Sequence, residues 1–413
     1  MLLEQQVTVA IIGGGPAGLM AAEVLSRQGV QVDLYDAMPS VGRKFLLAGV
    51  GGMNITHSEP KADFITRYPE GAVLVNDWLA EWDADALRAW ADELGASTFV
   101  GSSGRVFPKE MKAAPLLRAW LHRLREQGVR IHVRHRWLGW DDGALLFSSP
   151  NGHLKINAKA TLLALGGGSW AKLGSDGAWV KHLADQQVDI TPLVASNVGF
   201  QCQWSDYFKE KYQGKALKNI AAKVIVPHQD TLVAKKGEAM LTQFGIEGGL
   251  IYALGHALRT AYLQTGVARL SLDLLPDFSI EKIHSLLGAG RGAKSLSSFF
   301  ASKLKLDAVR FGLLREKLLP HQLDDLSLVA STLKNYEIAL TGMQPMDEAI
   351  STAGGVSEQS LSHRLMLKQL PGVFCAGEML DWDAPTGGYL LTATLASGRY
   401  AAHGILEWLQ ANQ

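Results

Sequence analysis

Residues 7–36, VTVAIIGGGPAGLMAAEVLSRQGVQVDLYD, decide the fold because their pattern predicts a strand, a glycine turn, a helix and a second strand. Val7–Ile12 is a β-branched apolar run, and the glycines of a G-x-G-x-x-G motif follow it at Gly13, Gly15 and Gly18. In such a motif the first glycine allows a tight turn, the second lets backbone approach a pyrophosphate, and the third lets the helix pack closely on the strand. The stretch therefore predicts a Rossmann-like unit that holds a dinucleotide pyrophosphate at a helix N-terminus.

An acidic residue completes this pattern. Asp36 ends the second predicted strand, about 20 residues after the glycines, where a carboxylate would accept hydrogen bonds from both hydroxyls of an adenosine ribose. The other interpretation is a glycine turn in an unrelated α/β protein. The acid and the strand before the glycines both favour the nucleotide site.

The composition is that of a globular protein of two or three domains. The chain has 413 residues, of which 47% are hydrophobic and 19% charged. Lys plus Arg and Asp plus Glu both number 40, so no overall charge argues for nucleic acid or membrane. Residues 190–345 alone contain 18 basic and 13 acidic residues, a mild excess that ordinary solvated faces would also explain.

Cysteine usage and the N-terminus indicate an ordinary cytoplasmic protein. Cys202 and Cys375 are the only cysteines and lie in no C-x-x-C or Cys/His cluster. We therefore expect no disulfide framework, no metal site and no dithiol redox pair. The sequence shows no signal-peptide pattern and no apolar run as long as a membrane span, so we expect no membrane partner.

The segments after Asp36 continue the α/β pattern. The glycine-dense loop 39–54 contains two adjacent cations, Arg43 and Lys44, which suit backbone passing close to an anionic cofactor; a flexible surface loop is the other interpretation. Amphipathic helices are predicted over 83–95, capped by Asp83, and over 115–128.

A small β-meander and a buried strand are expected next. Short β runs at 129–137, 144–148 and 153–156 are separated by Asp-Asp-Gly and Pro-Asn-Gly turns. The fully apolar run 160–165 then ends in Gly166–Gly168, as a buried parallel strand would beside a ligand.

From about residue 191 the pattern changes to short strands mixed with helices, including a helix predicted over 250–264, and we interpret this as an inserted module. The tail returns to the first pattern. The strand at 372–376 enters a glycine-acid turn at Gly377 and Glu378, and Gly387 and Gly388 precede a small-residue helix at 392–402. The dipole of such a helix would stabilise the negative charge of a reduced isoalloxazine near N1 and C2=O.

Together these motifs resemble the FAD oxidoreductases with two dinucleotide-binding motifs. More narrowly, the chain resembles the bacterial BaiN-like, aminoacetone-oxidase-like flavoproteins of the YhiN type, over most of its length. The motifs that carry the resemblance are GGGPAG at 13–18, GRK at 42–44, the GGxxN-like loop at 51–54, GRVFP at 104–108, ALGGGS at 164–169, TAGGV at 352–356 and GEMLDWDAPTGGYLL at 377–391.

The resemblance implies a Rossmann-like FAD domain with a parallel sheet and β-meander, interrupted by a mixed β-barrel-like and helical insert that caps the flavin. Its segments would be 1–190 and 345–413 for the FAD domain and 191–344 for the insert. It places the pyrophosphate at the first glycine turn, the ribose at Asp36, adenine near the Trp137 backbone, ribitol or pyrophosphate at Glu378, and the isoalloxazine at Gly387–Leu390. The implied FAD contacts are Gly13, Gly15, Pro16, Ala17, Gly18, Asp36, Ala37, Gly42, Arg43, Lys44, Asn54, Trp137, Ala164, Gly166, Gly167, Gly377, Glu378, Thr386, Gly387, Gly388, Tyr389 and Leu390.

The chain departs from the family pattern in two places. The family often has Arg-Cys-Asn where this chain has Gly52-Met53-Asn54, so an activity that requires the cysteine is in doubt, whereas Asn54 stays a candidate catalytic residue. The family often has Ser-Gly-Pro where this chain has Glu247-Gly248-Gly249. The resemblance implies that the segment 243–248 of the insert approaches the flavin from the other side, so Glu247 becomes a candidate acid or base. A helix-end carboxylate is the other interpretation.

The function predicted from the sequence is an FAD-dependent oxidoreductase of unknown substrate. The flavin and a small-molecule pocket are expected between the two domains. No second G-x-G-x-x-G follows a strand, so NAD(P)H would act only as a transient reductant over the ring; an amine is another electron donor. Two alternatives stay open: an enzyme that reduces uridine in ribosomal RNA, bound through the basic insert, and a flavin-binding sensor or scaffold without turnover.

Overall fold

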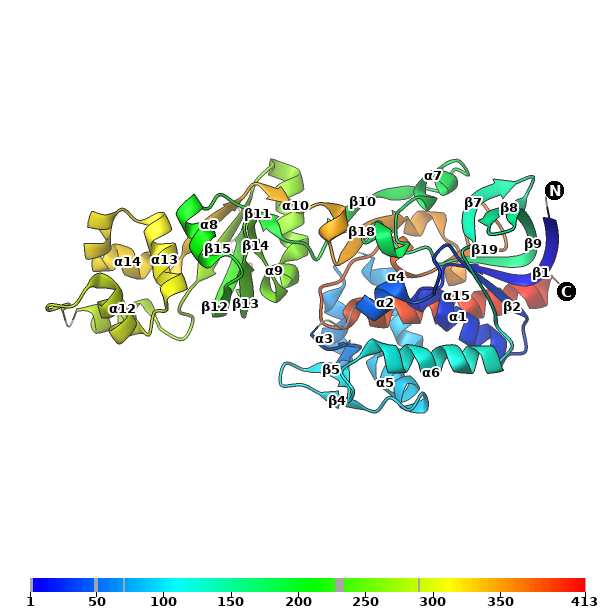
Figure 1. The fold of residues 1–413 in the computed structure, drawn as a ribbon, viewed down its shortest axis with the longest axis horizontal. Coiled ribbons are helices and arrows are strands. Elements are labelled where there is room, and N and C mark those ends of the chain that lie inside the picture. Colours follow the sequence, from blue (N-terminus) through cyan, green and yellow to red (C-terminus); the bar gives the residue numbers. More distant parts are fainter. Residues whose placement is uncertain (1–2, 48–50, 70, 227–233, 289, 413) are drawn as a thin grey trace. The chain divides into compact units, whose positions relative to one another are not determined.

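The structure, a computed structural model, describes residues 3–47, 51–69, 71–226, 234–288 and 290–412; residues 48–50 of the predicted glycine-rich loop lie outside it. The chain divides into two compact units: unit 1 is Met1–Ala195 with Met346–Gln413, and unit 2 is Ser196–Pro345 (Figure 1). Each unit has its own cluster of buried apolar side chains and therefore its own core. The predicted insert, 191–344, covers nearly the same residues as unit 2.

A seven-stranded, mostly parallel sheet forms the centre of unit 1. Its order is β6-β2-β1-β9-β8-β7, with β19 also paired to β9. β1 (Leu3–Ile12) pairs in parallel with β2 (Val32–Asp36) on one side and with β9 (Gly152–Leu163) on the other. The residues that follow these strands therefore meet at one edge of the sheet, the carboxyl edge. This arrangement confirms the predicted Rossmann-like α/β fold.

β9 corrects a prediction, because it is one strand where the sequence indicates two, at 153–156 and 160–165. Its first half pairs antiparallel with β8 (Ala144–Ser149), and its second half pairs in parallel with β19 (Val373–Cys375). On its other side β1 pairs along it almost throughout, including polar Asn157. Long-range pairing thus keeps the polar middle residues in the strand, although their local pattern suggests a break.

Helices α1 (Pro16–Arg27) and α15 (Tyr389–Ala411) pack closely on each other in unit 1 (Figure 1). A Cβ on Gly398 would lie 2.2 Å from the backbone oxygen of Ala17, so a glycine is needed at this contact. α15 starts before the predicted 392–402, because Gly388 at φ 95° caps it and accepts a 3.1 Å hydrogen bond from the Thr392 N–H.

The run predicted at 129–137 is wrong as a single strand of the meander: it is two strands, β6 (Arg130–Val133), which pairs in parallel with β2, and β7 (Arg136–Asp141), which pairs antiparallel with β8. The other predictions for unit 1 hold with small changes. The 83–95 helix is α5, and Asp83 caps it by accepting a 3.2 Å hydrogen bond from the Ala86 N–H. The loop 39–54 contains a helix that was not predicted, α2. The other elements of unit 1 are α2 (Arg43–Leu47), β3 (Thr56–His57), α3 (Lys61–Phe64), α4 (Ala72–Glu81), α5 (Ala84–Glu93), β4 (Thr98–Val100), β5 (Arg105–Pro108), α6 (Ala113–Glu126), β6 (Arg130–Val133), β7 (Arg136–Asp141), α7 (Trp179–Ala184), β10 (Ile190–Ser196) and β18 (Ser351–Val356).

Unit 2 contains an antiparallel, barrel-like sheet with the order β16-β15-β12-β13-β14-β11-β17. The strands at the two ends of this order, β16 (Tyr336–Leu340) and β17 (Gly342–Met343), are separated in the chain only by Thr341. The sheet must therefore curl until its ends nearly meet, which confirms the predicted barrel-like insert. The other strands are β11 (Phe200–Gln201), β12 (Ala216–Ile225), β13 (Lys235–Leu241), β14 (Gly245–Glu247) and β15 (Ala268–Asp273).

The helices of unit 2 include one correction. The helix predicted over 250–264 is two helices, α9 (Gly249–Ala253) and α10 (Gly255–Thr265). The Leu254 N–H bonds to the Ile251 oxygen three residues back, a 3₁₀-type turn that interrupts the α-helical ladder. The others are α8 (Asp206–Tyr212), α11 (Ile280–Leu287), α12 (Leu296–Leu304), α13 (Ala308–Lys317) and α14 (Leu326–Lys334).

Candidate functional site

The first glycine turn links β1 to α1 at the carboxyl edge. Gly13 has φ 108°, and a Cβ there would lie 2.2 Å from the Ala164 oxygen, so only glycine fits this position. Gly18 packs against the same turn, because its Cβ would lie 2.0 Å from the Gly13 oxygen. Both glycines thus allow β1, α1 and the segment after β9 to pack closely, as the motif predicts.

Gly15 is different from its neighbours, because a Cβ on it would meet no atom within 4 Å. It caps α1 with φ −80°, a conformation that any residue can adopt, and Pro16 begins the helix. Open space therefore lies beside the start of α1, where the helix dipole and the N–H groups of the first turn would stabilise a phosphate.

Asp36 lies beside this turn with both carboxylate oxygens engaged by backbone. One oxygen accepts a 2.8 Å hydrogen bond from the Gly14 N–H, and the other accepts a 2.7 Å bond from the Met38 N–H. Burial raises the pKa of Asp36, and these two N–H groups oppose that shift. Each oxygen keeps a further acceptor site, so the predicted ribose contact stays compatible with this geometry.

The second glycine turn lies at the N-terminus of α15. Gly387 and Gly388 have φ 129° and 95°, and a Cβ on Gly388 would lie 2.4 Å from the backbone of Thr56 in β3. A Cβ on Gly387 would lie 2.9 Å from the ring of Tyr389, the first residue of α15. The turn is therefore held between β3 and Tyr389, and it presents a second helix N-terminus.

An ion pair joins distant parts of the chain at the carboxyl edge. Lys44 Nζ donates to both oxygens of Glu378, at 2.9 and 2.6 Å, and to Ser169 Oγ at 2.8 Å. Glu378 also accepts a 3.0 Å hydrogen bond from the Thr352 N–H. Lys44 and Glu378 thus contact each other, and their predicted FAD contacts stay predictions.

Sequence reasoning missed Ser169 and Thr352 as members of this site. Thr352 Oγ1 accepts hydrogen bonds from the Gly168 and Ser169 N–H groups, at 2.9 and 3.1 Å. A Cβ on Gly167 would lie 2.4 Å from the same side chain. The TAGGV and ALGGGS motifs that contain these residues were the available signal.

Some buried polar atoms of unit 1 have no hydrogen-bond partner in the protein, and a bound dinucleotide would supply partners for those that line its site. Among the described residues, three such atoms belong to predicted FAD contacts: Arg43 Nε, Asn54 Oδ1 and Trp137 Nε1. A fourth, Ser175 Oγ, would lie 2.9 Å from a Cβ on Gly166. Buried polar groups normally have partners, and the phosphates, hydroxyls and ring atoms of FAD would supply them. The atoms of Arg43, Asn54 and Trp137 therefore fit this cofactor. The other unpartnered atoms among the described residues belong to no predicted contact: Tyr35 Oη, Trp78 Nε1, Trp120 Nε1 and Arg399 Nε.

Other predicted contacts have defined places in unit 1. Gly42 donates a 2.8 Å hydrogen bond to the Gly14 oxygen, Gly377 donates a 2.9 Å bond to Ser397 Oγ, and Ala164 donates a 2.8 Å bond to the Ile12 oxygen. Trp137 lies in β7 and packs its ring against Trp140, with centroids 4.8 Å apart. Ala37 and Leu390 directly follow Asp36 and Tyr389, and Pro16, Ala17 and Thr386 lie in or beside the two turns.

Glu247 lies in unit 2, at the end of β14 and opposite Met240 of β13. It precedes Gly248, which has φ 104° and caps α9. Burial raises the pKa of Tyr252 to about 12, and the Glu247 charge contributes to that shift. Glu247 is thus a charged group before a short helix, and its predicted approach to the flavin stays a prediction.

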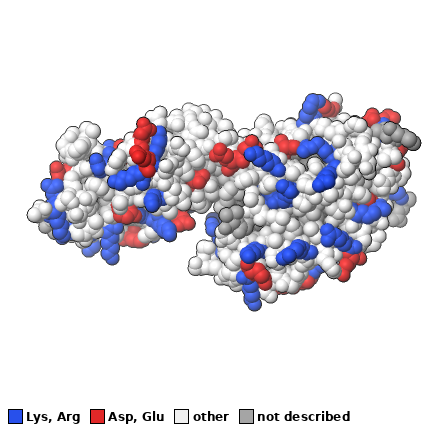
Figure 2. All heavy atoms as spheres, viewed as in Figure 1, with Lys and Arg blue, Asp and Glu red and all other residues white. Residues whose placement is uncertain are grey.

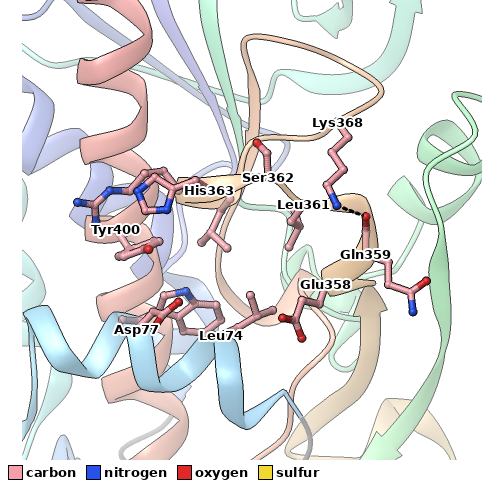
Figure 3. Close-up of a pocket in the computed structure, with 12 residues that line it drawn as sticks. Leu74, Asp77, Glu358, Gln359, Leu361, Ser362, His363, Lys368 and Tyr400 are labelled. Carbon is pink, nitrogen blue, oxygen red and sulfur yellow. Dashed lines mark hydrogen bonds between the residues drawn. The ribbon is translucent and has the colours of Figure 1, made fainter.

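A cavity of about 390 Å³ lies in unit 1 beside α4 and the middle of α15 (Figure 3). His363, Ser362 and Lys368 face Asp77 and Leu74 across it (Figure 3). Its lining includes none of the predicted site residues. Tyr400, which lines it, is eleven residues along α15 from Tyr389, about 16 Å at 1.5 Å per residue. The glycine turns, rather than this cavity, define the candidate site.

Solved structures with this fold include flavoproteins. The chain is similar to a 3-ketosteroid Δ1-dehydrogenase from Sterolibacterium denitrificans, with a TM-score of 0.53 and 11% identity over 97% of this chain and 99% of that one. It is also similar to a flavocytochrome c3 fumarate reductase, with a TM-score of 0.50 and 16% identity over 98% and 78% of the two chains. At these identities the likeness concerns the fold. The fold and the glycine turns together define a Rossmann-like protein of the dinucleotide-binding class.

The family follows from the sequence comparison. The chain matches the model described as HI0933-like protein Rossmann domain over residues 7–404, and it belongs to this family. Among curated proteins it is 23% identical to the ribosomal RNA dihydrouridine synthase of Escherichia coli (strain K12), over 92% of this chain and 93% of that protein. The protein of the same name from Haemophilus influenzae is 24% identical over the same shares. The predicted FAD-dependent oxidoreductase is confirmed as a class.

Proposed function

We propose that the protein binds FAD noncovalently along the carboxyl edge of the unit 1 sheet and transfers electrons between it and a small-molecule substrate. The observation that carries the proposal is the open space over Gly15 at the start of α1, beside the half-buried carboxylate of Asp36. When bound, FAD supplies the two-electron chemistry. The first turn would hold its pyrophosphate, Asp36 its ribose, and Gly387–Leu390 its isoalloxazine.

The electron donor is the finer part of this proposal. No second G-x-G-x-x-G follows a strand, so we infer that NADPH or NADH would bind only transiently, or that an amine donates the electrons. Anaerobic mixing of the FAD-loaded protein with NADPH, NADH and a panel of amines, followed by flavin absorbance, tests this. Bleaching by one donor at a saturable rate supports turnover. No bleaching by any of them would favour the sensor or scaffold alternative.

A second candidate substrate is uridine in ribosomal RNA. Two curated relatives with that activity in their names align over 92% of this chain, and unit 2 contains 18 basic against 13 acidic residues. Against it, basic and acidic side chains are mixed on the face of the molecule in Figure 2. Gly52-Met53-Asn54 also lacks the cysteine that is common in the family.

Salt dependence of RNA binding tests this second candidate. Filter binding measures the affinity of the protein for ribosomal RNA precursors at several salt concentrations. If RNA is the substrate, the logarithm of the binding constant should fall linearly with the logarithm of the salt concentration. The slope should be about −0.7 to −0.9 for each phosphate that the protein neutralises. Binding that is weak at low salt, or equal for unrelated RNA, would leave the small-molecule substrate as the answer.

A further inference from the structure

Glu59 and Arg67 form a bidentate ion pair in unit 1 that the proposed function does not use. Arg67 Nε and a terminal guanidinium nitrogen donate to the two Glu59 oxygens, at 3.0 and 2.6 Å. The Glu59 side chain is only 11% exposed, whereas that of Arg67 is 38% exposed. Such parallel hydrogen bonds fix both side chains in one geometry and hold the charges together.

This pair is linked directly to the first residue of α15. The Tyr389 side chain helps to lower the pKa of the Glu59 carboxyl, and the backbone oxygen of Tyr389 accepts a 2.9 Å hydrogen bond from the Tyr68 hydroxyl. The Tyr389 ring stacks on His57, with centroids 5.4 Å apart, and packs against Phe64 at 4.8 Å. Tyr389 is 6% exposed and also fills the space beside Gly387. His57 bonds to the Glu59 backbone and stacks on Tyr389, so the charged pair lies close to the second glycine turn.

The charge states of the cluster follow from these contacts. Burial would raise the pKa of Glu59, but the hydrogen bonds from Arg67 and Tyr389 outweigh it and lower that pKa. The Glu59 hydrogen bond raises the pKa of Arg67, and burial raises the pKa of Tyr389. At neutral pH the cluster thus contains one negative carboxylate, one positive guanidinium and a neutral phenol, and its net charge is zero.

His57 lies beside the pair and bonds to the backbone of Glu59. Its Nδ1 accepts a 3.1 Å hydrogen bond from the Glu59 N–H, so its proton is on Nε2, which lies 3.0 Å from the Ser103 oxygen. A second proton on Nδ1 would face the Glu59 N–H and lose this bond.

We propose that Glu59 and Arg67 are positioning residues whose balanced charges, acting through Tyr389, set the reduction potential of the flavin at the N-terminus of α15. The inference rests on the proposed function, which puts the isoalloxazine at Gly387–Leu390. Because a reduced isoalloxazine carries negative charge, an uncompensated nearby cation favours reduction and an uncompensated anion opposes it. The intact pair has no net charge and so neither favours nor opposes reduction. The reduced flavin is then stabilised by the positive end of the α15 dipole.

Two single variants should shift the potential in opposite directions. Glu59→Gln leaves Arg67 uncompensated, and the equilibrium ratio of reduced to oxidised flavin should rise about tenfold, or about 30 mV for two electrons. Arg67→Gln leaves Glu59 uncompensated, and the ratio should fall by a similar factor. The double variant should return towards the wild-type value. The measurement is equilibrium reduction against a reference dye at pH 8 and low salt, where screening is weak.

Conservative and distant variants separate charge from structure. Arg67→Lys keeps the charge without the bidentate geometry, and its ratio of reduced to oxidised flavin should stay within about twofold of the wild-type ratio. If Glu59→Gln does not fold, the comparison of Arg67→Lys with Arg67→Gln still tests the inference. Lys181→Gln is the control, because it breaks the exposed Lys181 to Asp185 pair, 2.9 Å apart on α7. Shifts of the same sign in both Gln variants, or no shift in either, would overturn the inference. A protein that binds no flavin at all would instead overturn the proposed function.

Discussion

Gly15→Ala is expected to leave the fold of the protein intact and to weaken FAD binding at least tenfold, a loss of about 1.4 kcal/mol or more. The substituted Cβ meets no protein atom within 4 Å, and φ −80° suits alanine as well as glycine. Since no atom of the described residues occupies that space, we expect it to serve a ligand at the start of α1. Titration of the apoprotein with FAD, followed by flavin fluorescence, measures the affinity, and thermal melting of the apoprotein checks the fold.

Two other glycine-to-alanine variants serve as controls for Gly15→Ala. Gly255→Ala in unit 2 also adds a Cβ that meets nothing within 4 Å, and it should change neither melting nor FAD affinity. Gly18→Ala adds a Cβ 2.0 Å from the Gly13 oxygen and should destabilise the protein itself. If Gly15→Ala binds FAD as tightly as wild type, the phosphate does not lie over the first turn, and the site assignment is wrong.

Glu247→Gln is expected to slow flavin reduction by about 10²–10⁴-fold once a donor is known, while FAD occupancy and melting stay near those of wild type. The expectation rests on the family resemblance, which implies that the segment 243–248 approaches the flavin. Stopped-flow reduction under anaerobic conditions measures the effect. Glu238→Gln, an exposed carboxylate on β13 of the same unit, is the control and should reduce at the wild-type rate.

The competing role of Glu247 is electrostatic support for the short helix that follows it. Loss of a helix-end charge costs about 0.3–1 kcal/mol of stability and leaves turnover unchanged. The two roles therefore predict different changes: the catalytic role lowers the rate of flavin reduction, and the helix role lowers the melting temperature. A Glu247→Gln protein that melts slightly lower and reduces at the wild-type rate would remove Glu247 from catalysis.

The first glycine turn could be predicted because its determinants are local. A β-branched run, three glycines at fixed spacing and an acid at the end of the next strand are all contained in residues 7–36. The structure gives Gly13 and Gly18 the tight contacts, and Gly15 the open space, that the motif requires. Helix α5 and its Asp83 cap were predictable for the same reason.

The rest of the site depends on contacts between residues far apart in the chain. Lys44 and Glu378 are separated by 334 positions, and neither carries a local sign of its partner. Tyr389 was predicted as a flavin contact, but its link to Glu59 comes from β3 and α15 meeting at Thr56 and Gly388. The continuity of β9 likewise follows from its neighbours β1, β8 and β19 rather than from its own sequence.

The central claim is that the two glycine turns and Asp36 form a noncovalent FAD site, and mass spectrometry of the cofactor released from the purified protein tests it most directly. Acid precipitation should leave colourless protein and a yellow supernatant, because no His or Cys lies in the loop 381–391 and both cysteines are buried elsewhere. The account predicts the mass of FAD in that supernatant. FMN would contradict it, since FMN has no adenosine for Asp36 and no pyrophosphate for the turn at Gly13–Gly18.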